Sequence, residues 1–263
     1  MKINGLRLVY EDDFRSGSLD RERWVIYNDR NGENAEGCEN LAFVKDGKLF
    51  IGADLQDRSL HGMTGCEIQT KHSLYFQYGY IEISAKLSHR PGACSAFWLN
   101  SASLPFDRLP EVDIYENFGR DDRLAHNLHR WWYDKDENGQ PIYGEEHLHH
   151  DQFASQTHWT LRNTYLTGGD TLSGRFHRIG LLWTPQVMEF YVDGNCSVAI
   201  DITDAYFRDF HQPMHIILSH TINDPTKAAQ AGVTASYDEY EYIRLYQDKD
   251  GILQDRRDGE ITL

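Results

Sequence analysis

The sequence has no long hydrophobic run. No stretch approaches the ~20 consecutive apolar residues that a membrane-spanning helix needs, so we expect no contact with a membrane. Internal repeats and low-complexity stretches are absent as well. The first five residues carry no apolar signal segment. We therefore expect a protein that stays inside the cell or a chain that begins after a removed signal.

Cysteine is scarce. The chain has four cysteines, and they are widely spaced: Cys38, Cys66, Cys94 and Cys196. No Cys-x-x-Cys pair is present, which argues against a zinc site, because such sites combine closely spaced thiolates. We expect four buried thiols, with one or two disulfide bridges as the alternative.

Positive charge is also in short supply. Lys and Arg number 26 against 41 Asp and Glu, and the net charge is −15. Nucleic-acid binding needs a basic surface, so nucleic acid is excluded as a partner. The same balance argues mildly against a heavily sulfated substrate. A local basic cleft would override it, and the residues that could form one, most of which we expect at the surface, are Arg30, Arg123, His129, Arg130, Arg175 and Arg178.

What the chain has instead is the pattern of β-strands. In residues 81–87, Ile and other apolar residues alternate with polar ones, which is typical of a half-buried strand. Asp193-Gly194 lies between two alternating runs and predicts a hairpin turn. Only residues 203–208 predict a helix, and a short one. We therefore expect an all-β fold, a jelly-roll sandwich of two curved antiparallel sheets with a concave substrate cleft.

The length of 263 residues suits one large domain, which we assign to residues 1–263, and we expect a monomer. Residues 120–175 differ from the rest because they are rich in His and in charged or Gly-containing spacers. We interpret them as long loops that flank the cleft, since loops on a rigid sandwich usually set specificity. The His147–His150 cluster has no acid at a known metal-ligand spacing, so no metal site is expected there.

The most informative segment is residues 111–116, where three carboxylates alternate with apolar residues. Strict alternation along a strand places Glu111 and Asp113 on one face but turns Glu116 toward the apolar face. A charged Glu is almost never buried without a partner. We therefore predict a β-bulge around Ile114 and Tyr115, which would return Glu116 to the side of the other two acids.

Carboxylates held close together are the groups that cleave glycosidic bonds, one as nucleophile and one as general acid and then base, at about 5–5.5 Å when configuration is retained. Asp113, between them, would hydrogen-bond the nucleophile and influence the pKa of both neighbours. The alternative is an acidic edge strand, or a strand that ends before a turn at residues 117–119.

Residues 111–116 and the segments around them resemble glycoside hydrolase family 16 in its bulged Glu-x-Asp-x-x-Glu form, which includes laminarinases, agarases, porphyranases and endo-β-galactosidases. The resemblance runs through nearly the whole chain. Its further segments, in order, are 10–14 (YEDDF), 44–49 (VKDGKL), 67–71 (EIQTK), 78–82 (YGYIE), 92–99 (GACSAFWL), 183–185 (WTP), 190–194 (FYVDG) and 242–246 (YIRLY).

The resemblance implies a retaining glycoside hydrolase with a double-displacement mechanism. Glu111 would attack the anomeric carbon, and Glu116 would protonate the leaving oxygen and then activate water. Asp113 would keep Glu111 ionised and correctly turned. The substrate would be a polysaccharide or oligosaccharide.

The resemblance also implies binding residues. Trp98 would stack on a sugar ring, since it shares a strand face with Ala96 and Asn100 while Phe97 and Leu99 point to the core. The remaining candidate substrate-binding residues are Glu67, Gln69 (where many members have Arg), His129 near the acid/base glutamate, and Trp131 and Trp132 further out. We expect Trp183 in the core.

No cofactor is expected for catalysis. A structural calcium on the convex side is common in the family, and oxygen ligands suit that ion. The matching positions are Asp13, Gly47 and Glu241, the last standing where Asp is usual. The alternative is two surface acids and a turn glycine.

The substrate is the least determined property. Cys94 stands where many laminarinases carry Trp, and Leu109-Pro110 and residues 217–221 lack aromatic residues that lichenases have. These departures favour galactans of the agar, porphyran or endo-β-galactosidase type over β-1,3- or mixed-linkage glucans. A transglycosylase, or a non-catalytic carbohydrate-binding sandwich or lectin, is a remoter alternative.

Overall fold

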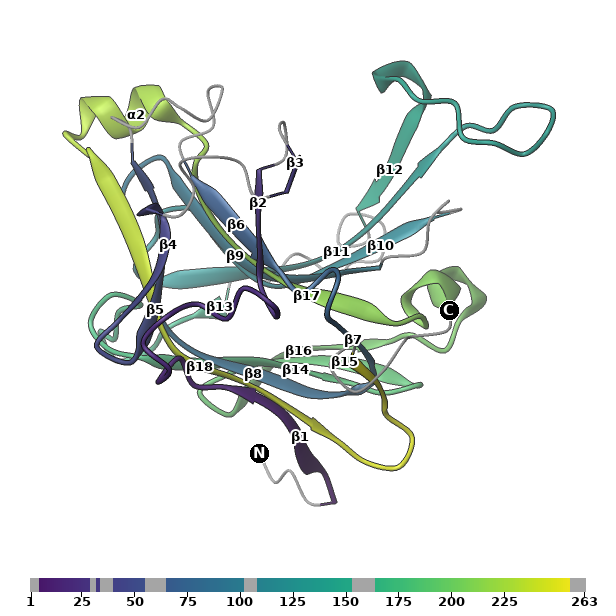
Figure 1. The fold of residues 1–263 in the computed structure, drawn as a ribbon, viewed down its shortest axis with the longest axis horizontal. Helices are drawn as coiled ribbons and strands as arrows, with labels where there is room; N and C mark the ends of the chain where they lie inside the picture. Colours follow the sequence, from purple (N-terminus) through teal and green to yellow (C-terminus); the bar gives the residue numbers. More distant parts are fainter. Residues whose placement is uncertain are drawn as a thin grey trace.

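The structure is a computed structural model that describes residues 5–28, 32–33, 40–54, 65–101, 108–152 and 164–255. Two antiparallel sheets pack face to face, as the alternating sequence predicted (Figure 1). The eight-stranded sheet has the order β16 (Asn195–Asp201), β15 (Val187–Val192), β14 (His177–Trp183), β8 (Gly79–Lys86), β18 (Ala235–Gln247), β5 (Lys48–Asp54) and β4 (Ala42–Lys45), with β1 (Arg7–Asp12) paired to β18.

The eleven-stranded sheet carries the residues of interest. Its order is β12 (Leu148–Gln152), β11 (Arg123–Tyr133), β10 (Leu109–Asn117), β9 (Ala93–Ser101), β17 (Met214–Ile222), β6 (Cys66–Gln69), β2 (Val25–Asn28) and β3 (Gly32–Glu33). Short strands β13 (Thr164–Tyr165), β7 (Leu74–Gln77) and β19 (Ile252–Asp255) attach to β11, β17 and β7. Figure 1 shows β2 and β3 on one side and β12 on the other, rising from the face that points away from the eight-stranded sheet.

The core lies between the sheets and is built from one face of most of the strands. Phe97 and Leu99 are fully buried in it, as predicted, and so is Trp183. The predicted strand at residues 81–87 is β8, and the predicted turn Asp193-Gly194 joins β15 to β16. In the part of the chain that the structure describes, no helix is both long enough and apolar enough to cross a bilayer.

Helices are few and short among the described residues. The predicted helix at residues 203–208 is a 3₁₀ helix, η3 (Ala205–Phe210), whose first turn is capped by the side chain of Asp204. Another 3₁₀ turn, η2, spans Glu145–His147. The expectation of a single helix was wrong, because α2 (Pro225–Gln230) follows β17 with an Asp cap and Pro at its start, a combination that favours helix initiation.

Two further expectations need correction. Residues 120–175 are not only loops, because β11 runs through Arg123–Tyr133 and pairs with β10 along most of its length. Cysteines are not all buried: Cys66 is buried, Cys94 is half-buried and Cys196 is exposed, and these three are free thiols. Cys38 lies outside the described residues.

Candidate active site

The three acids of β10 share one face because the strand contains a bulge. Asp113 lies opposite Trp98 of β9, whereas Tyr115 already lies opposite Phe97, so Ile114 has no partner on β9. The register with β11 shifts at the same place, between Asp113 and Glu116. The extra residue turns both Ile114 and Tyr115 into the core, where neither is exposed. The bulge is therefore where the burial argument predicted it.

The face opposite the core carries three rows of side chains that cross neighbouring strands in register. The first row consists of His215, Asn100, Glu111, His129 and Gln152. The second consists of Gln69, Ile217, Trp98, Asp113 and Asn127. The third consists of Glu67, Ser219, Ala96, Glu116 and Ala125. We call this surface the carboxylate face.

Glu111 is held from β11. The indole Nε1 of Trp131 donates to its Oε2 at 3.2 Å, and His129 Nε2 lies 4.0 Å from its Oε1. Burial, followed by the nearby Asp113, raises the pKa of Glu111 to about 7, while His129 and Trp131 oppose that rise. Near neutral pH the side chain is therefore poised between a carboxylate and a neutral acid.

Asp113 is the most buried of the three, with 4% of its surface exposed. Its Oδ2 lies 3.0 Å from His129 Nε2 but accepts no well-aligned hydrogen bond among the described residues. Burial, with Glu116 adding to it, raises the pKa of Asp113 well above its usual range. When it is protonated, Asp113 has an O–H that can donate to a neighbouring carboxylate.

Glu116 has a different partner. The side-chain amide of Asn127 donates to its Oε2, and Gln152 Nε2 donates in turn to Asn127 Oδ1 at 3.1 Å. Burial raises the pKa of Glu116, while the Asn127 bond and His129 lower it. Asn127 and Gln152 were not among the candidate residues. The alternation of Asn127, His129 and Trp131 was the available signal, and it is meaningful only once the segment is recognised as a strand.

Comparison with known proteins fits this geometry. Residues 9–248 match a family model described as the family 16 glycoside hydrolase domain of β-porphyranases A–D. The chain belongs to glycoside hydrolase family 16. A curated relative, glucan endo-1,3-β-glucosidase A1 of Niallia circulans, is 22% identical over 94% of the chain, but the chain spans only 39% of that protein's length.

Other members of family 16 are similar to comparable degrees. The extracellular agarase of Streptomyces coelicolor is 25% identical, over 86% of this chain and 77% of its own. The catalytic domain of a Thermotoga petrophila endo-1,3-β-glucanase (laminarinase) superposes with a TM-score of 0.69, at 22% identity, covering 93% of this chain and 98% of the other. This structural likeness shows the fold that the chain shares with family 16.

Three of the binding residues inferred from the family 16 resemblance, Trp98, Glu67 and Gln69, lie on the carboxylate face. Trp98 lies beside Asp113 on the carboxylate face, with its Nε1 donating to Ser219 Oγ at 3.2 Å. Glu67 and Gln69 lie on the same face beyond β17, and the Gln69 amide donates to Glu67. These positions are compatible with contacts to a bound glycan.

The two tryptophans of β11 lie on opposite faces. Trp131 faces the carboxylates and stacks on His150, with ring centroids 3.8 Å apart. Trp132 points the other way, against His149 and the guanidinium of Arg130. The structure therefore brings Trp131 to the carboxylates and leaves Trp132 away from them.

In the part of the chain that the structure describes, two clusters have the composition of a metal site. The ligand atoms of Glu111, Asp113 and His129 lie within 4.8 Å of one another, and these are the residues of the carboxylate face. The second cluster consists of Asp170, His177 and Asp193. There the Arg175 guanidinium bridges both carboxylates, and both His177 nitrogens are hydrogen-bonded, to Asp193 and to a backbone carbonyl. An internal ion-pair network therefore accounts for the second cluster.

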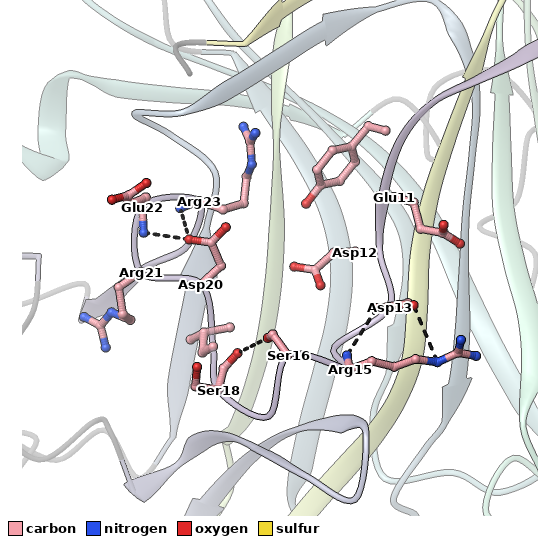
Figure 2. A pocket seen from close by; sticks show the side chains of 12 residues that line it. Glu11, Asp12, Asp13, Arg15, Ser16, Ser18, Asp20, Arg21, Glu22 and Arg23 are labelled. Atoms are coloured by element: carbon pink, nitrogen blue, oxygen red, sulfur yellow. Dashed lines mark hydrogen bonds and ion pairs between the residues drawn. The ribbon is translucent and has the colours of Figure 1, made fainter. Parts of the chain in front are cut away.

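The family 16 calcium positions lie where the end of β1 and the start of β5 pair with the middle of β18. Asp13 follows β1, Gly47 forms the β4–β5 turn, and Glu241 is the bulged residue of β18. Their oxygen donors suit calcium. Figure 2 shows Arg15 folded back onto Asp13, with Nε 3.5 Å from Oδ2, beside the cavity lined by residues 10–23. Glu241 accepts from Ser84 Oγ at 2.6 Å. These donors are of the type that calcium takes, and Arg15 would compete with such an ion for Asp13.

Proposed function

We propose that this chain is a retaining endo-glycosidase that hydrolyses internal β-linkages of a polysaccharide. The observation that carries the proposal is the bulge at Ile114, which gathers Glu111, Asp113 and Glu116 on one face in a chain that belongs to glycoside hydrolase family 16. A strand with a purely structural role has no reason to gather three buried or half-buried carboxylates, since each costs free energy to desolvate.

Glu111 is the nucleophile in this proposal. It attacks the anomeric carbon to form a glycosyl-enzyme while Glu116 donates a proton to the leaving oxygen. Glu116, now ionised, removes a proton from water, and that water releases the sugar from Glu111. The raised pKa of Glu116 suits the acid, and the hydrogen bond from Trp131 together with the nearby His129 stabilises the anion of Glu111. A neutral Asp113 would donate to the Glu111 carboxylate and hold it in place.

The substrate we favour is a galactan of the agar or porphyran type, or a glycan cut by endo-β-galactosidases. The match to the porphyranase model over residues 9–248 and the agarase relative support this choice. Cys94, half-buried on β9, leaves a smaller side chain near Glu116 than a tryptophan would. Among the described residues, the three rows contain histidines but no Arg or Lys, which favours a glycan with few sulfate groups.

A β-1,3- or mixed-linkage glucan is the second candidate. The Niallia relative and the Thermotoga structure carry names that describe action on such glucans. The Thermotoga structure has the fold that this chain shares, but fold alone does not determine the substrate. We also propose that a calcium ion bound by Asp13, Gly47 and Glu241 stabilises the eight-stranded sheet, away from the carboxylate face.

The test is reducing-end release from agarose, porphyran, κ-carrageenan, keratan-type glycans, laminarin and mixed-linkage β-glucan. Glu111→Gln is the inactive variant, and Glu22→Gln, an exposed glutamate remote from β10, is the control. We expect the wild type and Glu22→Gln to cut one galactan and Glu111→Gln to be inactive. Cleavage of glucans alone would overturn the galactan choice. Silence on every polymer, with binding retained, would overturn the hydrolase proposal in favour of a lectin. Products longer than the substrate would indicate transglycosylation.

A further inference from the structure

Strand β12 lies beside β11 at the edge of the eleven-stranded sheet, within the segment that the sequence suggested to be loops. Its side chains alternate between two faces. Gln152 lies opposite His129, and His150 lies opposite Trp131, so both point to the side of the carboxylates. His149 and Asp151 point the other way, toward Trp132 and Arg130.

Gln152 reaches Glu116 through one intermediate side chain. Its Nε2 donates to Asn127 Oδ1 at 3.1 Å, and the Asn127 amide donates to Glu116. Because an amide group is planar, fixing its oxygen fixes the direction in which its N–H groups point. Without Gln152, Asn127 can rotate and present either end of its amide to the carboxylate.

His150 reaches the other two acids in the same manner. Its Nε2 lies 2.7 Å from His129 Nδ1, and His129 Nε2 lies 3.0 Å from Asp113 and 4.0 Å from Glu111. If the neutral His129 ring carries its proton on Nε2, toward the acids, then Nδ1 must accept a hydrogen bond, and His150 is placed to donate it. Stacking on Trp131, with ring planes 18° apart, holds His150 in that position.

We propose that β12 is an orienting layer for the catalytic carboxylates: Gln152 positions Asn127 against Glu116, and His150 fixes His129 against Asp113 and Glu111. That the oriented carboxylates are catalytic rests on the proposed function. That β12 holds Asn127 and His129 in place does not. Gln152 and His150 are positioning residues, since they act on the acids through Asn127 and His129.

A structural role alone does not account for this arrangement. His150 is exposed, and exposed hydrogen bonds contribute little to stability because water replaces them. The two sets of contacts instead lead to Glu116 and Glu111, whose pKa values depend on Asn127 and His129. Asn127 and His129 both lower the pKa of Glu116, and His129 lowers that of Glu111. The other titratable side chains that interact with Glu116, among the described residues, are Asp113 and Glu111 on its own strand and Cys94 on β9.

The experiment is a ¹³C carboxyl NMR titration of glutamate-labelled protein. The resonances of Glu111 and Glu116 are assigned by their absence in the Glu111→Gln and Glu116→Gln variants. Gln152→Leu keeps the size of the side chain and removes its amide. His150→Phe keeps the stacking and removes the nitrogens, and His150→Gln returns a donor. His149→Phe, on the same strand but the opposite face, is the matched control.

We expect Gln152→Leu to raise the pKa of Glu116 by roughly half a pH unit or more, because its Asn127 bond is loosened. The same change in an Asn127→Ala background should add nothing further, as coupled residues are not additive. His150→Phe should raise the pKa of Glu111, His150→Gln should restore it in part, and His149→Phe should change neither. Where hydrolysis is measurable, kcat/KM should fall about tenfold in Gln152→Leu and in His150→Phe, with KM little changed.

Unchanged titration of both glutamates in Gln152→Leu and His150→Phe, with folding intact by circular dichroism, would overturn the inference. An equal shift in His149→Phe would also overturn it, because the effect would then come from β12 as a whole. The titration does not require turnover. A chain that is silent on every polymer but shows the expected shifts would therefore refute the proposed function and leave the orienting role standing.

Discussion

Trp131 Nε1 donates a hydrogen bond to Glu111 Oε2 at 3.2 Å, from the strand next to the one that carries the acid. The usual expectation for a tryptophan in a carbohydrate cleft is a stacking platform. Here the same ring stacks on His150 and supports the anionic form of Glu111, because the bond lowers the pKa of the carboxyl group. Trp131 therefore acts on the proposed nucleophile itself.

Trp131→Phe tests this relationship. Phenylalanine keeps a ring against His150 but has no N–H, so we expect the pKa of Glu111 to rise. A hydrogen bond to a charged group contributes about 1.5–3 kcal/mol, and a shift of about one pKa unit is the corresponding lower limit. The acidic limb of the pH profile of kcat/KM should move to higher pH by that amount. An acidic limb at the wild-type pH would mean that Trp131 acts only through packing.

The second prediction concerns the buried hydrogen bonds of Tyr115, a residue of the bulge. The Tyr115 hydroxyl lies 3.0 Å from that of Tyr240, which donates to Asp238 at 3.2 Å, and all three side chains are fully buried. Tyr115→Phe should lower the free energy of unfolding by about 1–2 kcal/mol, the cost of leaving one buried group with a lost partner. Urea denaturation measures it, with Tyr143→Phe, at an exposed tyrosine, as the control.

The same residue should influence activity, because Tyr115 belongs to the bulge that returns Glu116 to the carboxylate face. We expect Tyr115→Phe and Tyr240→Phe to be less destabilising together than the sum of the two single changes. Additive losses would show that the two hydroxyls do not act as a unit.

The sequence allowed the bulge to be predicted because two local rules conflict there. Strand alternation and the cost of burying a charge cannot both be satisfied by residues 111–116 without an extra residue. The facing of Trp98, with Phe97 and Leu99 in the core, followed from alternation in the same way. Such properties depend on a few neighbouring residues, so one sequence is sufficient to infer them.

The register between strands that are distant in the sequence could not be inferred in this way. Asn127 contacts Glu116 only because Ala125 of β11 lies opposite Glu116 after the bulge, and no local rule fixes that pairing. Residues 120–175 were interpreted as loops because polar and charged residues dominate them. In β11 those polar residues line the carboxylate face, where function overrides the usual preference for apolar strand residues. Without that register, the face of β11 on which Trp132 lies could not be inferred, and Trp132 was assigned to the cleft.

The third prediction concerns calcium. If Asp13, Gly47 and Glu241 hold the ion, millimolar Ca²⁺ should raise the melting temperature relative to EDTA, since a ligand that binds only the folded state stabilises it. Asp13→Asn should reduce this difference. Arg15→Ala should enlarge it, because the Arg15 guanidinium no longer competes for Asp13. Melting temperatures that are equal with Ca²⁺ and EDTA in the wild type and in Arg15→Ala would refute the proposed site.

The last prediction follows from the raised pKa of Glu111, from 4.5 to about 7, caused first by burial. The folded state then binds a proton more tightly than the unfolded state, so stability falls as pH rises between those two values. At about 1.4 kcal/mol per pKa unit, the loss is at most about 3.5 kcal/mol. Glu111→Gln, which cannot ionise, should therefore be more stable than the wild type at pH 8 and nearly equal to it at pH 4.

Urea denaturation at both pH values measures this difference, with Glu22→Gln as the control for an exposed glutamate. The sign is informative because a nucleophile must be ionised to attack, and the ionised form is the one that burial disfavours. A variant that gains stability at pH 8 while losing all hydrolysis would show that the fold holds Glu111 in a state that serves the reaction rather than stability. A Glu111→Gln protein less stable than the wild type at pH 8 would contradict this and would make the carboxylate of Glu111 a structural group.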